Sequence, residues 1–159
     1  MKEEFEMLGK SAEFKTWKKT HSDSFLAYAF LMKGVVKEEW QFGYYNPQKD
    51  TVTAFAVSEK IFMNPESEMF KEDSVKKLDM EKVKISLDDS FKTVEELKKK
   101  DYPHFKTLQT MVILQNMKIG QVWNITFIPA DYKVLNVKID SENGEILKQG
   151  LVELFSIQK

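Results

Sequence analysis

The chain repeats one pattern of residues, and this repeat limits the possible folds more than any other feature. The only two histidines, His21 and His104, stand 83 positions apart, and so do Trp40 and Trp123, two of the three tryptophans. Apolar residues between and around them follow the same offset, which becomes 82 after Tyr45. An internal repeat of this length spans a whole supersecondary unit. The sequence therefore predicts one unit used twice.

Each predicted unit is a helix followed by an antiparallel meander. In the first unit the helix covers residues 2–19, and the strands cover 25–32, 39–45 and 51–58. A short strand at 83–87 is predicted at the end of the connector. The second unit then has a helix that ends at Pro103, followed by strands at 106–115, 121–128, 133–140 and 145–152. We expect Asp88, Asp89 or Ser90 to cap this helix, or a capping box that begins at Thr93. The predicted fold class is α+β, with two tandem helix-plus-meander units packed as one body: a first unit at 1–60, a connector at 61–87 and a second unit at 88–159.

The first predicted helix carries apolar residues on two sides. One stripe contains Phe5, Leu8 and Ala12, and the opposite stripe contains Met7, Phe14 and Trp17. A helix that is apolar on two sides is usually sandwiched between layers of its own chain. The other interpretation is a contact with a partner or a second copy of the chain.

Composition excludes several classes of function. Hydrophobic residues make up 42% and charged residues 31% of the 159 residues, as in soluble globular proteins. The net charge is −1 and there is no arginine, which argues against a nucleic-acid partner. Without cysteine, disulfides and thiolate chemistry are excluded.

Apolar runs and the N-terminal segment bear on the cellular location. No apolar run approaches the roughly 20 residues of a membrane-spanning helix. The segment 1–10 is rich in glutamate and does not resemble a signal peptide. We therefore expect a cytoplasmic protein, or an extracytoplasmic one if a leader or anchor has been removed.

Residues near the C-terminus carry a family resemblance. A predicted helix opens with Leu87-Asp88-Asp89-Ser90, and a later predicted strand contains Val122-Trp123-Asn124-Ile125. The run from Val137 to Leu147 begins as a strand that ends in Asp140. It then turns at Asn143-Gly144 and continues with Glu145 and two apolar residues. This ending resembles that of PepSY-type domains, over about 65 residues of the chain. The resemblance implies a cystatin-like helix-on-sheet fold, often in tandem and often outside the cytoplasm. It also implies a binding or protease-modulating role rather than an enzymatic one.

The usual carriers of chemistry point to structural roles. His21 and His104 each follow a predicted helix, where a histidine can cap carbonyl groups, and no metal-ligand spacing accompanies them. The segment from Asp140 to Glu145 departs from a calcium loop in the position of its glycine and is interpreted as a hairpin turn. Asp88, Asp89, Glu95 and Glu96 fit a helix start. No catalytic, metal-binding or cofactor-binding residue is predicted.

Aromatic residues are the remaining signal. They are expected mainly in the core, with Tyr45 on the opposite face of its strand. As a candidate binding or interface surface we predict Trp17, Trp40, Tyr44, Tyr45, Phe55 and Trp123. The predicted function is a non-enzymatic binding or protein-interaction module, modulating another protein such as a protease, with the sheet surface as its contact.

Two alternatives remain open at this point. One is a small-molecule-binding or enzymatic helix-on-sheet domain with a cavity near Trp40, Tyr44 and His21. The other is a structural homodimer through the two-sided first helix, in which Trp17→Glu would give a stable monomer.

Overall fold

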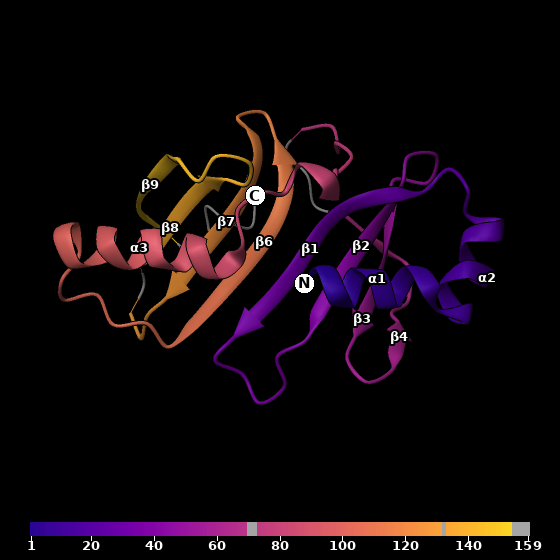
Figure 1. The fold of residues 1–159 in the computed structure, drawn as a ribbon, viewed down its shortest axis with the longest axis horizontal. Coiled ribbons are helices and arrows are strands. Elements are labelled where there is room, and N and C mark those ends of the chain that lie inside the picture. Colours follow the sequence, from indigo (N-terminus) through magenta and orange to yellow (C-terminus); the bar gives the residue numbers. More distant parts are fainter. Residues whose placement is uncertain (70–72, 132, 154–159) are drawn as a thin grey trace.

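The structure, a computed structural model, describes residues 1–69, 73–131 and 133–153. They form one antiparallel sheet and three α-helices (Figure 1). The helices are α1 (Lys2–Lys10), α2 (Ala12–Thr20) and α3 (Leu87–Asp101), with a 3-10 turn η1 (Met80–Lys82). The strands are β1 (Phe25–Lys33), β2 (Trp40–Asn46), β3 (Thr51–Val57), β4 (Ile61–Met63), β5 (Ser67–Glu68), β6 (Gln109–Met117), β7 (Gly120–Ile128), β8 (Lys133–Asp140) and β9 (Ile146–Glu153). The three strands predicted after the first helix and the four predicted after the second are confirmed, to within a few residues at their ends.

The prediction of two helix-plus-meander units is wrong, because a single sheet runs through both halves of the chain. Its strand order is β4-β3-β2-β1-β6-β7-β8-β9, and β5 pairs with β3. The joint lies between β1 and β6, where Tyr28 opposes Gln115 and Lys33 opposes Thr110. Residues 1–60 and 88–153 thus supply neighbouring strands of one sheet, and the domain division stays a prediction. Residues 70–72, 132 and 154–159 of the predicted connector and second unit lie outside the described residues.

The predicted helix at 2–19 is two helices, and the break explains its two apolar stripes. Ser11 adopts an extended conformation, with φ −71° and ψ 145°, between α1 and α2. Its hydroxyl donates to the Leu8 carbonyl oxygen at 2.7 Å and accepts from the Phe14 amide at 3.2 Å, so it caps both helices. The turn brings Phe14 and Trp17 to the same side as Phe5 and Leu8, all of which pack on the core.

The start of α3 also differs from the prediction. Ser86, rather than Asp88, Asp89, Ser90 or Thr93, is the cap, and its hydroxyl accepts from the Asp89 amide at 3.1 Å. The short strand predicted at 83–87 is absent: that segment passes from η1 into the helix. It is held to the sheet because the Trp123 indole donates to the Ile85 carbonyl oxygen at 2.9 Å.

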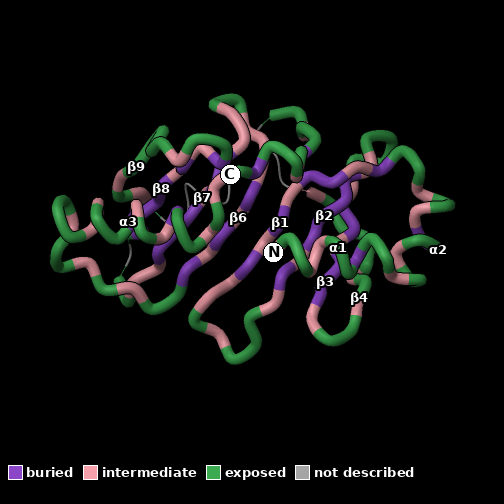
Figure 2. Tube along the Cα trace, viewed as in Figure 1, coloured by how far each residue is buried: buried purple, intermediate pink, exposed green. Residues whose placement is uncertain are grey.

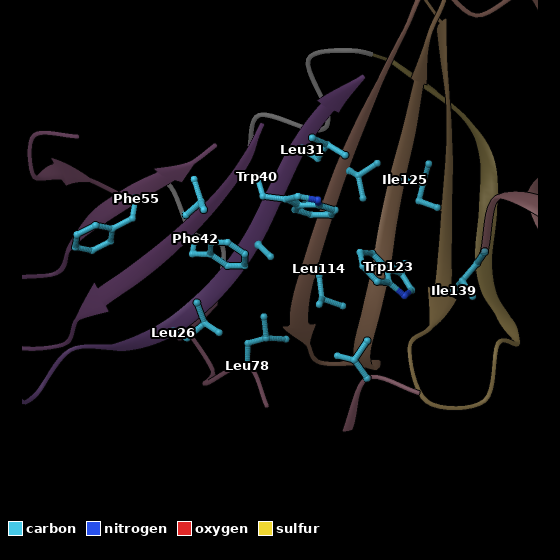
Figure 3. Packing of buried hydrophobic residues seen from close by; sticks show 14 of the residues in the cluster. Leu26, Leu31, Trp40, Phe42, Phe55, Leu78, Leu114, Trp123, Ile125 and Ile139 are labelled. Atoms are coloured by element: carbon cyan, nitrogen blue, oxygen red, sulfur yellow. The ribbon is translucent and has the colours of Figure 1, made fainter. Parts of the chain in front are cut away.

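The core lies between the three helices and one face of the sheet. Figure 1 shows α1 and α3 in front of the sheet, and Figure 2 shows buried segments concentrated along the central strands. Ring contacts join each helix region to this face: Phe5 to Phe42 at 5.4 Å, Phe14 to Tyr44 at 5.0 Å, and Phe91 to Phe127 at 6.4 Å. Across the two halves the Trp40 and Trp123 rings lie 6.3 Å apart (Figure 3). The core is therefore continuous through the whole sheet.

The opposite face of the sheet has its own close contact, between Tyr28 and Gly43. Tyr28 of β1 opposes Gly43 of β2, beside a bulge in β1. A β-carbon on Gly43 would overlap the Tyr28 ring, so the ring lies directly on the glycine backbone. Burial raises the pKa of the Tyr28 phenol. Glycine is needed here for space.

Replacing Gly43 with alanine should destabilise the protein by about 1–3 kcal/mol, because an added methyl group must displace the packed ring. Gly9→Ala in α1 is the matched control, since nothing lies within 4 Å of a β-carbon there. It should leave stability unchanged or raise it by less than about 1 kcal/mol. Urea unfolding of both variants measures the difference. Equal midpoints for Gly43→Ala and the parent protein would contradict the Tyr28 contact.

Candidate functional site

The predicted aromatic surface lies inside the protein. Five of its residues lie in the core between the helices and the sheet and expose at most 8% of their surface: Trp17, Trp40, Tyr44, Phe55 and Trp123. Trp17 is surrounded by other rings, with centroids 5.8 Å from Phe14, 5.6 Å from Tyr44 and 5.0 Å from Phe55. These residues build the core, so they do not offer a ready contact surface.

Tyr45 lies on the other face of β2, as predicted. It is buried, at 6% exposure, and its ring centroid lies 5.6 Å from that of Phe25. Its hydroxyl donates to the Asp50 carboxylate in the turn before β3. Asp50 adopts a left-handed φ of 57°, and this bond supports the turn. Tyr45 therefore stabilises the β2–β3 connection.

His21 is the C-terminal cap of α2, which confirms the structural role predicted for it. Its ring stacks on that of Trp17 at 4.5 Å, and its Nδ1 lies 2.8 Å from the Trp17 carbonyl oxygen. His104 is exposed, between α3 and β6. Tyr44 and His21 both contact the Trp17 ring, whereas Trp40 packs against Trp123, so these three residues pack against other rings. Among the described residues no group of three or more His, Asp and Glu side chains could hold a metal ion.

The surface that the sequence did not predict lies on the opposite face of the sheet. All three α-helices contact the other face, and no described helix covers this one. Side chains alternate along a strand, so the neighbours of core residues in β1 and β6 point to this open face. We call this set the open-face strip: Tyr28, Phe30, Met32, Met111 and Ile113. All five are half-buried.

The register places the open-face strip in one block across the centre of the sheet. Phe30 opposes Ile113, and Met32 opposes Met111. Buried and half-buried residues alternate in the structure from Tyr28 to Met32 of β1. In the sequence the same strand is a continuous apolar run, which does not show which of its sides is open. The block contains two aromatic side chains, two methionines and one isoleucine.

Polar side chains continue the open face over β7 and β8. The buried Asn136 amide nitrogen donates to Asn124 Oδ1 at 2.8 Å and to Thr126 Oγ1 at 2.9 Å. Lys138 donates to Asn136 Oδ1 at 2.6 Å. Burial, and then the nearby charge of Lys148, lower the pKa of the Lys138 ammonium group. The network is fixed by these bonds and forms a polar border to the strip.

Comparisons with known proteins add a fold but no family. No family model matches the chain, and no curated protein matches it. A solved structure is similar: a protein of Clostridium difficile 630 named a putative lipoprotein, with a TM-score of 0.55 and 12% identity over 88% of this chain and 90% of that one. At this identity the likeness shows the fold alone. The PepSY resemblance and the internal repeat therefore remain predictions.

The sequence predicts no membrane-spanning helix. Within residues 1–69, 73–131 and 133–153, no helix is both long enough and apolar enough to cross a membrane.

Trp17→Glu should unfold or strongly destabilise the protein, by about 3–5 kcal/mol, rather than release a stable monomer. The substitution removes a buried ring from an aromatic cluster and places a charge there. Met7→Glu is the control, because Met7 is 45% exposed on α1 and should change stability by less than about 0.5 kcal/mol. Thermal unfolding and mass in solution measure both. A folded, monomeric Trp17→Glu variant from a dimeric parent would restore the homodimer interpretation.

Proposed function

We propose that this protein is a non-enzymatic protein-interaction module that binds its partner through the open-face strip. The single observation that supports this is the arrangement of the helices: all three pack on one face of a wide sheet, and the opposite face presents a central apolar block. In this proposal the contact surface is a face of the sheet, but the face opposite five of the six predicted aromatic residues; only Tyr45 lies on the same face as the strip.

The chemistry of the strip suits a protein partner. Protein interfaces combine an apolar centre, enriched in aromatic residues and methionine, with a polar rim. The strip supplies Phe30, Tyr28 and two methionines, and the Asn124–Asn136–Lys138 network lies beside it. Methionine side chains adapt to irregular apolar surfaces. Because the strip residues are already half-buried on a rigid sheet, little side-chain entropy is lost when they are covered.

Two resemblances support the proposed location and the proposed kind of partner. The similar Clostridium difficile protein is named a putative lipoprotein, which supports an extracytoplasmic position in this proposal. The PepSY resemblance supports a role in modulating another protein, such as a protease. Both are part of the proposal and rest on likeness rather than on geometry.

Phe30→Lys and Ile113→Lys test the strip. Each places a charge at the centre of the proposed contact and should weaken partner binding at least about tenfold, as expected for a central interface residue. Leu108→Lys is the matched control, because Leu108 is 65% exposed just outside β6. Immobilised parent protein and the three variants are compared for the proteins that they retain from an extract of the source organism.

The account predicts at least one protein retained by the parent and by Leu108→Lys but lost from both strip variants. Equal unfolding midpoints in urea establish that all variants are folded. Retention of the same proteins by all four would contradict the proposal. A parent protein that is a dimer, with Phe30→Lys a monomer, would show that the partner is a second copy.

A further inference from the structure

A hollow of about 200 Å³ lies on the helix-facing side of the sheet, between α3 and the ends of β1, β6 and β7. The sheet contributes Lys33, Thr110 and Phe127, and α3 contributes Phe91, Glu95 and Lys98. Thr107, in the segment before β6, completes the lining. The hollow is on the opposite face from the open-face strip, so it is a separate site.

The hollow exists because the core pattern changes at this end of the sheet. In the preceding row across β1, β6 and β7, the helix-facing residues are Leu31, Val112 and Ile125, all buried and apolar. In the next row the register aligns Lys33, Thr110 and Phe127. A cation and a hydroxyl group thus replace two apolar side chains beneath α3. Polar residues at core-facing positions mark places where function competes with packing.

Both lysines are held against aromatic rings. The Lys98 ammonium group lies 4.5 Å from the Phe127 ring centroid, and the Lys33 ammonium group lies 5.6 Å from that of Phe91. The Lys98 side chain is only 13% exposed. Its ammonium group donates to Thr107 Oγ1 at 3.2 Å and lies 3.5 Å from Glu95 Oε1. The cation is therefore fixed in position and largely removed from water, where its attraction for an anion is stronger.

We infer that this hollow binds a carboxylate that carries a small apolar group. The residues that line the hollow carry one net positive charge, from two ammonium groups and the Glu95 carboxylate. Glu38, outside the lining, lies 3.7 Å from the Lys33 ammonium group, so a bound carboxylate would compete with Glu38 for Lys33. A single negative charge therefore matches this site better than a phosphate dianion does. The Phe91 and Phe127 rings, whose centroids are 6.4 Å apart, provide an apolar wall for the rest of the ligand. The volume suits a group smaller than most drug-sized ligands. A short-chain fatty acid and the C-terminal residue of a peptide share this chemistry.

A second hollow, of about 390 Å³, lies beside α2. It is lined by Gly9, Phe14, Lys15, Lys18 and Lys19. Its cations all come from α2, and Lys15 and Lys19 are exposed. Lys18 donates to the Ser24 carbonyl oxygen. The first hollow differs from the second because its cations come from two separate elements and two aromatic rings form its wall.

Titration of the isotope-labelled full chain with hexanoate and with N-acetyl-leucine tests the site by NMR. Each should shift the backbone amide signals of Lys33, Thr110 and Lys98 saturably, with a dissociation constant on the order of 1 mM, as expected for so small a ligand. Hexanamide and N-acetyl-leucinamide, which lack the charge, should not. A preference for hexanoate would identify a fatty acid as the natural ligand class, and a preference for N-acetyl-leucine a peptide C-terminus.

Two variants and one control complete the test. Lys98→Met and Lys33→Met should each weaken carboxylate binding at least tenfold, and the more exposed Lys33 serves if Lys98→Met does not fold. Lys92→Met is the control on the same helix, because its side chain is 80% exposed and pairs with Asp89 at 3.7 Å outside the hollow. It should bind as the parent does. Absence of saturable shifts, equal shifts with the neutral amides, or equal losses in Lys92→Met and Lys33→Met would overturn the inference.

Discussion

The pairing of β1 with β6 is the contact on which the rest of the structure depends. Without it, each half would end in an edge strand with a row of unpaired backbone groups. With it, Ala29, Leu31, Val112 and Leu114 become central core residues that expose at most 7% of their surface. The Trp40 and Trp123 rings also come within 6.3 Å of each other across the joint. Hydrogen bonding and core packing therefore support one another at the middle of the sheet.

The same pairing positions both the open-face strip and the hollow beneath α3. A sheet of this width is only partly matched by three short helices, all of which lie on one side. The central strands then present Phe30 and Ile113 on the open face. On the covered face, α3 spans the row of Lys33, Thr110 and Phe127, where packing gives way to a hollow. One site is apolar and broad, which suits a protein, and the other is small and cationic, which suits an anion.

Local structure could be predicted from the sequence, because alternation and turn residues mark strands regardless of their neighbours. The β8–β9 hairpin at Asn143-Gly144 is an example: Gly144 has φ 82°, and its amide donates to the Asp140 carbonyl oxygen at 2.9 Å. The pairing of β1 with β6, whose opposed residues lie 77 to 87 positions apart in the sequence, could not be predicted. Side-chain periodicity identifies the faces of a strand and not its neighbours. The break at Ser11 was missed because a single serine costs a helix little.

The candidate site was harder to predict for a related physical reason. Aromatic residues are the same chemical signal whether they build a core or a contact surface, and Trp17, Trp40 and Phe55 build the core. The strip was hidden because Phe30 and Met32 belong to a continuous apolar run, which looks alike whether one face or both are covered. Lys33 follows that run and resembles an ordinary strand end. Only the register with Thr110 and Phe127 shows that it lies beneath a helix.

Amide hydrogen exchange is the most direct measurement of the central claim. If one sheet joins the halves, β1 and β6 are interior strands, and their amides should exchange only on global unfolding, at the slowest rates in the molecule. The amides of the edge strand β9 should exchange much faster by local opening. Amides of β1 and β6 that exchange as fast as those of β9 would show that both are edges, and would contradict the single sheet and the surfaces derived from it.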